Sequence, residues 1–106
     1  MGAEFIMPTA FFLTKLKKGV KAQDYEKWVH SSDYPTAKKI KSIKSYRVHR
    51  INGAFMGDKV YDYVEVIEIT NLDDYGKDLN SDVGKKLLAE WGNYIGESVT
   101  IHGELV

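Results

Sequence analysis

The segment Tyr61–Ile69, YDYVEVIEI, is the clearest strand pattern in the chain. Large apolar or aromatic residues alternate on both of its sides, with Val60, Val64 and Val66 on one side and Tyr61, Tyr63, Ile67 and Ile69 on the other. An antiparallel strand with one solvated face normally carries polar residues on that face. The pattern therefore predicts a sheet that is covered on both faces.

The remaining patterns predict three more strands and two helices. Strands are expected over residues 9–16, 43–51 and 98–105, and helices over residues 21–31 and along a longer segment marked by Val83, Leu87, Leu88, Trp91 and Ile95. Short helical turns are expected at 35–40 and 71–78. The order β-α-β-β-α-β is typical of an α+β, ferredoxin-like protomer, a four-stranded antiparallel sheet with its helices on one face. Two helices cannot cover both faces, so we expect a homodimer that packs sheet to sheet.

Composition limits the domain organisation and the possible partners. A chain of 106 residues is one domain, and its 15 basic and 15 acidic residues cancel, which argues against nucleic acid or an anionic membrane as partner. Cysteine is absent and no apolar run approaches the roughly 20 residues of a membrane-spanning helix, so a cytoplasmic location is expected. Glu4-Phe5 is what a common restriction site encodes, and residues 1–6 are interpreted as a cloning remnant before a domain at 7–106.

The stretch from His30 to Ala37, HSSDYPTA, follows the first expected helix. Asp33 can cap a new helical turn, and Pro35 is tolerated at the start of such a turn because its missing N–H needs no partner there. His30 can be a favourable charge at a helix C-terminus. Tyr34 has no role in a cap, so the stretch is also a candidate rim of an active site.

The second strand carries the other polar cluster, SYRVHR at residues 45–50. If residues 51 and 60 pair, His49 lies opposite Asp62 and Tyr46 lies opposite Glu65. A carboxylate beside a histidine suits a general base, although such cross-strand pairs are also common structural contacts. Glu65 is either desolvated with a raised pKa, which suits a general acid, or paired with Arg50 or Lys44.

Trp28 and Trp91 fall on the inner faces of their helices, where they pack in the core or line an aromatic pocket. The three histidines show no metal-binding spacing, and the single glycines form no phosphate-binding loop. The sequence therefore predicts neither a metal nor a cofactor.

Three segments together resemble the RedY-like family of prodiginine (red tripyrrole pigment) biosynthesis: Tyr25-x-x-Trp28-x-His30-x-x-Asp33-Tyr34-Pro35-Thr36-Ala37, Ser45–Arg50 and Tyr61–Glu68. The resemblance implies a dimeric α+β barrel with a ligand pocket between helices and sheet. It also implies a role in assembling or modifying an aromatic heterocyclic intermediate, here a bipyrrole. Asp33, Tyr34 and His49 match the family pattern.

The leading hypothesis is a cofactor-independent acid–base enzyme that cyclises or dehydrates a pyrrole-type intermediate. His49 is the expected base, Asp33 and Tyr34 polarise or protonate the substrate, and Arg47 anchors a carbonyl or carboxylate. Trp28, Glu65 and Trp91 are the other expected substrate-binding residues. Two alternatives remain: a non-catalytic carrier of a pyrrole intermediate, and a cofactorless monooxygenase suggested by fold analogy.

Overall fold

The computed structural model describes residues 7–106 and confirms the predicted β-α-β-β-α-β order. The strands are β1 (Thr9–Leu16), β2 (Ile43–Arg50), β3 (Tyr63–Ile69) and β4 (Ile95–Gly103). The helices are α1 (Ala22–Trp28), the π-helical turn η1 (Val29–Asp33), α2 (Tyr34–Ala37), α3 (Leu72–Leu79) and α4 (Asp82–Trp91). The interpretation of residues 1–6 as a cloning remnant lies outside the described residues.

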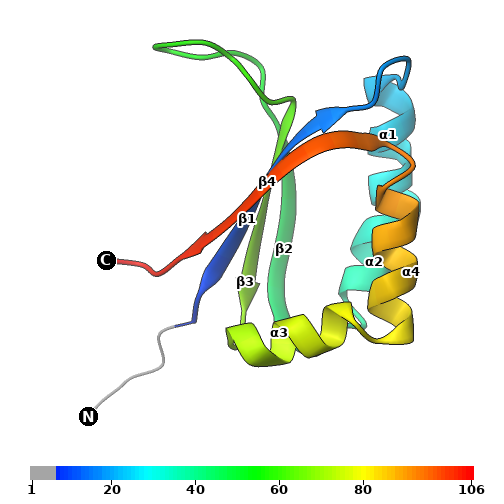
Figure 1. Cartoon of the computed structure of the whole chain (residues 1–106), viewed down its shortest axis with the longest axis vertical. Coiled ribbons are helices and arrows are strands. Elements are labelled where there is room, and N and C mark those ends of the chain that lie inside the picture. The colour runs from blue at the N-terminus through cyan, green and yellow to red at the C-terminus, as the bar shows by residue number, and fades with distance from the viewer. Residues whose placement is uncertain (1–6) are drawn as a thin grey trace.

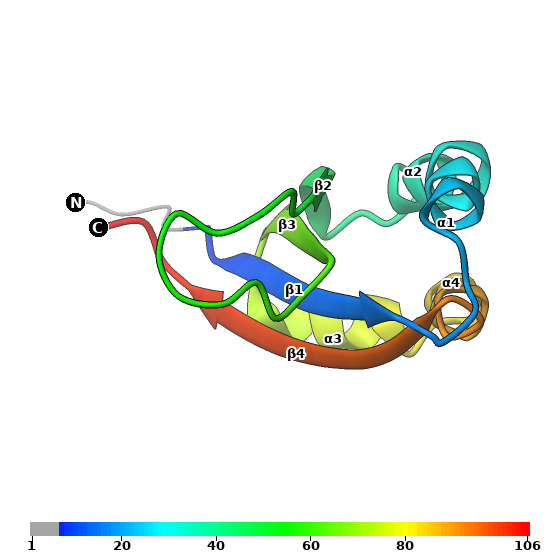
Figure 2. The same cartoon turned by 90° about the horizontal axis from the view of Figure 1, so that it is seen from above.

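The four strands form one antiparallel sheet in the order β2-β3-β1-β4. The first helical segment and α4 run along one face of this sheet, and α3 lies across its lower end (Figure 1). The view from above shows the same two layers, with the opposite face of the sheet left open (Figure 2). The fold is therefore the expected ferredoxin-like protomer, and β2 is a free edge strand next to α2.

The core lies between the helices and the inner face of the sheet. Along β3 the residues alternate strictly, and Tyr63, Glu65, Ile67 and Ile69 are the buried ones. Tyr25 of α1 and Leu87 of α4 pack in the same cluster as Tyr63. Each fully buried aliphatic side chain stabilises the fold by roughly 1.5–3 kcal/mol, so a carboxylate among them needs a specific explanation.

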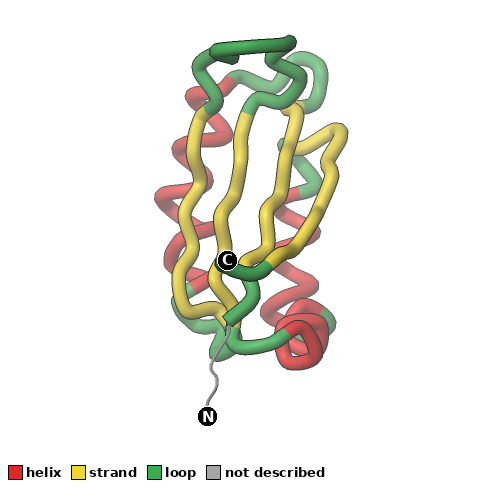
Figure 3. Tube along the Cα trace, turned by 90° about the vertical axis from the view of Figure 1, so that its left-hand side faces the viewer, coloured by secondary structure: helices red, strands yellow, loops and turns green. Residues whose placement is uncertain are grey.

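The open face of the sheet is turned toward the viewer in Figure 3. It carries the side chains that alternate along each strand with those facing the helices. On the outer strand β4, Val99 and Ile101 expose 43% and 49% of their surface. Val64 and Val66 of β3 share this face and are half-buried. In the single chain, helices cover only one of the two faces that we expected to be covered. The apolar residues Val64, Val66, Val99 and Ile101 on the other face have no helix packed on them.

Several predicted boundaries are wrong: β3 begins at Tyr63 and not at Tyr61, and β4 begins three residues earlier than residue 98. The longer helix ends at Trp91 and does not reach Ile95, which is the first residue of β4. Gly92 and Asn93 interrupt the helical pattern there, because glycine and asparagine favour helix ends. Val83 and Leu88, two of the apolar residues that mark this helix in the sequence, are exposed to 43% and 37%.

Gly84 permits the tight junction between α3 and α4. The hydroxyl of Ser81 caps α4 by accepting the Gly84 N–H at 3.2 Å. A Cβ atom at Gly84 would lie 2.7 Å from the Cα of Leu79. Only glycine therefore fits where the two helices approach each other.

Candidate active site

The helical segment from residue 22 to residue 37 is continuous, which corrects the expectation of a helix, a break and a capped turn. In η1 the Tyr34 N–H donates to the carbonyl of Val29, five residues earlier, and the backbone stays helical through Asp33. The Asp33 side chain makes no capping bond, so the cap interpretation is wrong. Single π-helical turns inside α-helices are frequent at functional sites, and this one places the Asp33 carboxyl in the interior.

Asp33 and Glu65 are buried carboxyl groups joined by one phenol. Their exposed fractions are 0% and 2%. The Tyr46 hydroxyl lies 2.9 Å from both Asp33 carboxyl oxygens and 2.7 Å from Glu65 Oε1. A single hydroxyl carries one proton, so it donates to one carboxyl and accepts from the other. We call Asp33, Tyr46 and Glu65 the acid–phenol cluster.

The electrostatics of the acid–phenol cluster keep a proton in it. None of the ion pairs among the described residues includes Asp33 or Glu65. Burial, followed by the charge of Glu65, raises the pKa of Asp33 from 3.8 to about 7. Burial also raises the pKa of Glu65, although hydrogen bonds from Tyr46 and Trp91 oppose it. Because Glu65 accepts hydrogen bonds from both Tyr46 and Trp91, we assign the carboxylate to Glu65 and the titrating proton to Asp33.

The raised pKa predicted for Glu65 is thus confirmed, and the alternative pairing with Arg50 or Lys44 is wrong. Arg50 instead donates from Nε to Glu26 Oε2 at 2.7 Å. The Tyr63 hydroxyl donates to the same Glu26 oxygen at 2.6 Å. Arg50 therefore pairs with Glu26 at the end of β2 and not with Glu65.

The two tryptophans have different environments. The Trp91 indole N–H donates to Glu65 Oε2 at 2.9 Å, so this side chain contacts the acid–phenol cluster directly. The Trp28 indole N–H donates to Glu90 Oε1 at 3.0 Å, and its ring stacks on Tyr25. Trp28 is 8% exposed and belongs to the core, whereas Trp91 is part of the candidate site.

Tyr34, which a cap cannot explain, closes part of the free edge of β2. Its hydroxyl accepts the Val48 N–H at 3.1 Å and lies 3.5 Å from the Val48 carbonyl oxygen. Its ring meets the Tyr46 ring edge-on at 5.9 Å and the His30 ring at 5.4 Å. Tyr34 therefore replaces a neighbouring strand at Val48 and packs against Tyr46.

Two hollows adjoin Tyr46. A small cavity of about 20 Å³ lies beside the acid–phenol cluster, between Phe12, Ile67 and Trp91, and is large enough for about one water molecule. An open groove of about 440 Å³ lies on the other side, between α2 and the edge of β2. Tyr46 and Ile43 line both hollows and separate them.

The assumed pairing of residues 51 and 60 is wrong by two residues. The Ile51 N–H bonds the carbonyl of Asp62, and His49 pairs with Val64. Asp62 instead accepts the Leu16 N–H at 2.9 Å and pairs with Lys59. The expected His49–Asp62 pair is therefore absent.

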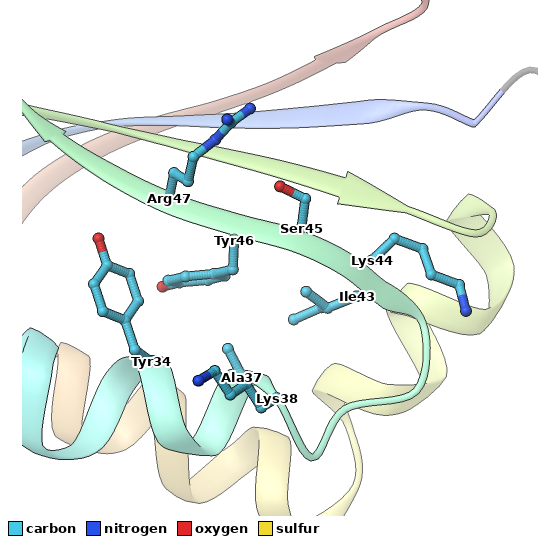
Figure 4. A pocket seen from close by; sticks show the side chains of 8 residues that line it. All are labelled: Tyr34, Ala37, Lys38, Ile43, Lys44, Ser45, Tyr46 and Arg47. Carbon is cyan, nitrogen blue, oxygen red and sulfur yellow. The ribbon is translucent and has the colours of Figure 1, made fainter.

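The structure separates the three residues expected to be catalytic. His49 and Tyr34 line an edge groove of about 320 Å³ together with His30, while Asp33 lies in the interior. Arg47 pairs with Val66, is exposed, and points away from the helices at the mouth of the larger groove (Figure 4). His49 and Asp33 thus do not share a pocket within one chain.

Tyr46 is the site residue that we did not predict. In the assumed register it stood opposite Glu65; in the structure it pairs with Ile67 and reaches Glu65 diagonally. The sequence offered one indication that Tyr46 faces the helices: it shares a side of β2 with the apolar residue Val48. Within residues 7–106 no group of three or more His, Asp or Glu side chains is placed to hold a metal ion, and no helix is long and apolar enough to cross a membrane.

The sheet topology and the one-sided helical layer define the class of ferredoxin-like α+β proteins, several of which are dimers. Solved structures with this fold include an ethyl tert-butyl ether degradation (EthD) family protein from Bacillus halodurans, at 18% identity and TM-score 0.76, covering 94% of this chain and 99% of that one. A dimeric ferredoxin-like protein from Thermobifida fusca matches at 19% identity and TM-score 0.71, covering 94% and 92%.

Within this class the chain belongs to the family described as HapK, REDY-like protein, whose model matches residues 8–106. The crystal structure of HapK from Hahella chejuensis is similar at 27% identity and TM-score 0.81, and the match covers 94% of this chain and 93% of that one. A search of curated proteins finds no significant match. The family resemblance seen in the sequence is confirmed.

Proposed function

We propose that the protein is a cofactor-independent acid–base enzyme of prodiginine production that cyclises or dehydrates a pyrrole-type intermediate. The observation that supports this proposal is the acid–phenol cluster, two buried carboxyl groups bridged by the Tyr46 hydroxyl. Buried carboxyl pairs whose pKa values are driven apart provide an acid and a base at the same pH. The family context supports the pathway.

In a dehydration the cluster would supply both proton transfers. The Glu65 carboxylate takes a proton from carbon, and the protonated Asp33 gives one to the departing hydroxyl, so that water and a new double bond are formed. The Tyr46 hydroxyl then passes a proton from Glu65 back to Asp33, which restores the starting state. For this, the small cavity beside the cluster must widen toward the groove when substrate binds.

The other expected site residues receive supporting roles in the proposal. Trp91 holds Glu65 by its indole N–H and forms a wall of the cavity. Tyr34 positions Tyr46. Arg47 lines the groove but points away from the helices, so an anchoring role would require its side chain to turn toward the substrate. Trp28 supports the helix that carries Asp33. His49, the base expected from the sequence, lines the edge groove and has no catalytic role in this proposal. The cytoplasmic location stays a prediction.

The proposal includes a homodimer formed through the open face of the sheet. Val99 and Ile101 are exposed there, and an apolar face of this kind normally has a partner. Two of the similar structures are described as dimeric. A second copy packed on this face would bury the second face of the sheet, as the strand pattern predicts.

The proposal can be tested with purified protein and the bipyrrole intermediate that accumulates in a producing strain lacking the gene. We expect turnover by the wild type, a loss of about 10²–10⁴-fold in Asp33→Asn and Glu65→Gln, and little change in the exposed control Asp24→Asn. The rate should also fall as the pH rises through 7, because Asp33 then loses the proton it donates. His49→Ala tests the earlier candidate base in the same assay.

Each alternative has a distinct outcome. Undiminished turnover in both carboxyl variants would remove the acid–phenol cluster from the mechanism. Stoichiometric binding of the intermediate without conversion by the wild type would indicate a carrier. Consumption of oxygen with the intermediate would indicate a monooxygenase.

A further inference from the structure

The groove between α2 and β2 has an aromatic and aliphatic floor. Figure 4 shows Tyr34 and Ala37 on the helix pointing toward Tyr46 and Ile43 on the strand. Its volume of about 440 Å³ lies in the range typical of small-molecule sites. The floor suits a flat ring that packs against the two tyrosines.

The mouth of the groove carries positive charge only. Lys38, Lys44 and Arg47 line it, and no acidic residue does. All three are exposed, and none forms an ion pair with any residue among 7–106. The whole chain has a net charge of zero, so this concentration of cations is a local feature and not a consequence of composition.

The backbone of the edge strand adds a directed hydrogen-bond donor. Peptide groups alternate in direction along an antiparallel strand. Those of Val48 point outward, since Tyr34 bonds them, and the N–H of Tyr46, two residues earlier, therefore points outward into the groove. An anionic group placed there accepts this N–H and is attracted by the positive charge of the groove's lining, although the Arg47 side chain itself points away from the helices (Figure 4).

We propose that this groove binds an aromatic ring bearing a carboxylate, with the ring against Tyr34 and Tyr46 and the carboxylate at the mouth. The inference rests on the proposed function and deepens it, because it names an anionic aromatic as the class of substrate. It also gives a role to Lys38, Lys44 and Arg47, which line the groove without any acidic residue among the lining. Bound in this way, the ring lies directly against the phenol of the acid–phenol cluster.

A peptide added as a fifth strand is a different occupant, and the geometry disfavours it. Strand addition needs several successive outward-facing backbone groups on the edge strand. Tyr34 closes the edge at Val48, which leaves only Tyr46 and Lys44 with outward groups in the groove. That length is too short for a strand to pair.

The test uses 2-naphthoate as the probe and 2-naphthamide as its neutral match, titrated into the full chain by calorimetry in chloride buffer. We expect the carboxylate to bind at least about tenfold more tightly than the amide. The triple variant Lys38→Gln, Lys44→Gln, Arg47→Gln should lose about tenfold in affinity, as expected for removing three exposed positive charges from the lining of the groove. The matched control, Lys18→Gln, Lys85→Gln, Lys86→Gln, removes the same charge elsewhere and should bind as the wild type does.

Amide NMR titration locates the bound probe, and the Tyr46 N–H should show one of the largest shifts. Equal binding of naphthoate and naphthamide, equal loss in both triple variants, or shifts confined to other segments would overturn the inference. Inorganic phosphate is a third probe, and its binding as tightly as naphthoate would overturn the inference by showing recognition of charge alone. Shifts along all of β2 on addition of an unstructured peptide would identify strand addition instead.

Failure of this inference differs from failure of the proposed function. If the wild type converts its intermediate but does not prefer the carboxylate probe, only the groove assignment fails. If naphthoate binds as expected while Asp33→Asn and Glu65→Gln keep full turnover, only the acid–base proposal fails. The triple variants leave Asp33, Tyr46 and Glu65 intact, so the two tests are independent.

Discussion

Replacing Asp33 by asparagine should make the stability of the protein nearly independent of pH between 5 and 7.5. The asparagine side chain resembles the protonated acid, since its amide N–H can donate to the Tyr46 hydroxyl while that hydroxyl donates to Glu65. The variant therefore keeps the hydrogen bonds of the acid–phenol cluster. What it removes is the ionisation of a carboxyl that is 0% exposed.

The expected magnitude follows from the raised pKa of Asp33. Between pH 3.8 and about 7 the folded protein holds this proton and the unfolded chain does not. Stability therefore falls as the pH rises, by about 1.4 kcal/mol for each unit. From pH 5 to pH 7.5 the wild type should lose about 2.5 kcal/mol through this group.

Urea unfolding at pH 5.0 and 7.5, at one protein concentration, measures the difference in the free energy of unfolding. Asp33→Asn should remove most of the pH dependence, and the exposed Asp24→Asn on the same helical segment should retain it. Glu65→Gln should reduce it, because the Glu65 charge is one cause of the raised pKa of Asp33. Equal pH dependence in the wild type and Asp33→Asn would refute the assignment of the proton to Asp33.

Three further predictions concern the phenol, a helix junction and the open face. Tyr46→Phe should lower stability by about 1–3 kcal/mol in urea unfolding, because both carboxyl groups lose their shared hydrogen-bond partner. Gly84→Ala should lower stability by about 1–3 kcal/mol in urea unfolding, whereas Gly76→Ala, with no atom within 4 Å of the added Cβ, should not. Val99→Glu should convert the expected dimer to a monomer in sedimentation experiments; a dimer that persists would contradict the proposed interface.

The strand and helix order was predictable because strong periodicity marks nearly every element. β1 occupies residues 9–16, as expected, since TAFFLTKL ends directly before a lysine pair and Gly19. The register of β2 and β3 was not predictable, because the long connection at 51–62 does not specify which residues pair. The error of two residues preserved which side chains share a face, so Tyr46 and Glu65 stayed together while His49 and Asp62 separated.

The candidate site was predictable only in part, because the local signals at residues 33–35 have two meanings. Aspartate two residues before proline is a common helix start, and nothing in the sequence shows that the helix instead continues through a π-helical turn. That turn rotates Asp33 toward the sheet. The burial of Glu65 was predictable from its apolar neighbours Tyr63 and Ile67, but its partner, Tyr46, comes from a strand whose register was unknown.

Tyr46 connects the two parts of the proposed site. Its hydroxyl touches both carboxyl groups, and the same residue lines the groove and the small cavity. A ligand that moves the ring also moves the proton that the hydroxyl shares between Asp33 and Glu65. Binding in the groove should therefore change the pKa of Asp33. A shift of the Asp33 titration on saturation with naphthoate would show this coupling, and an unchanged titration would show that groove and cluster act separately.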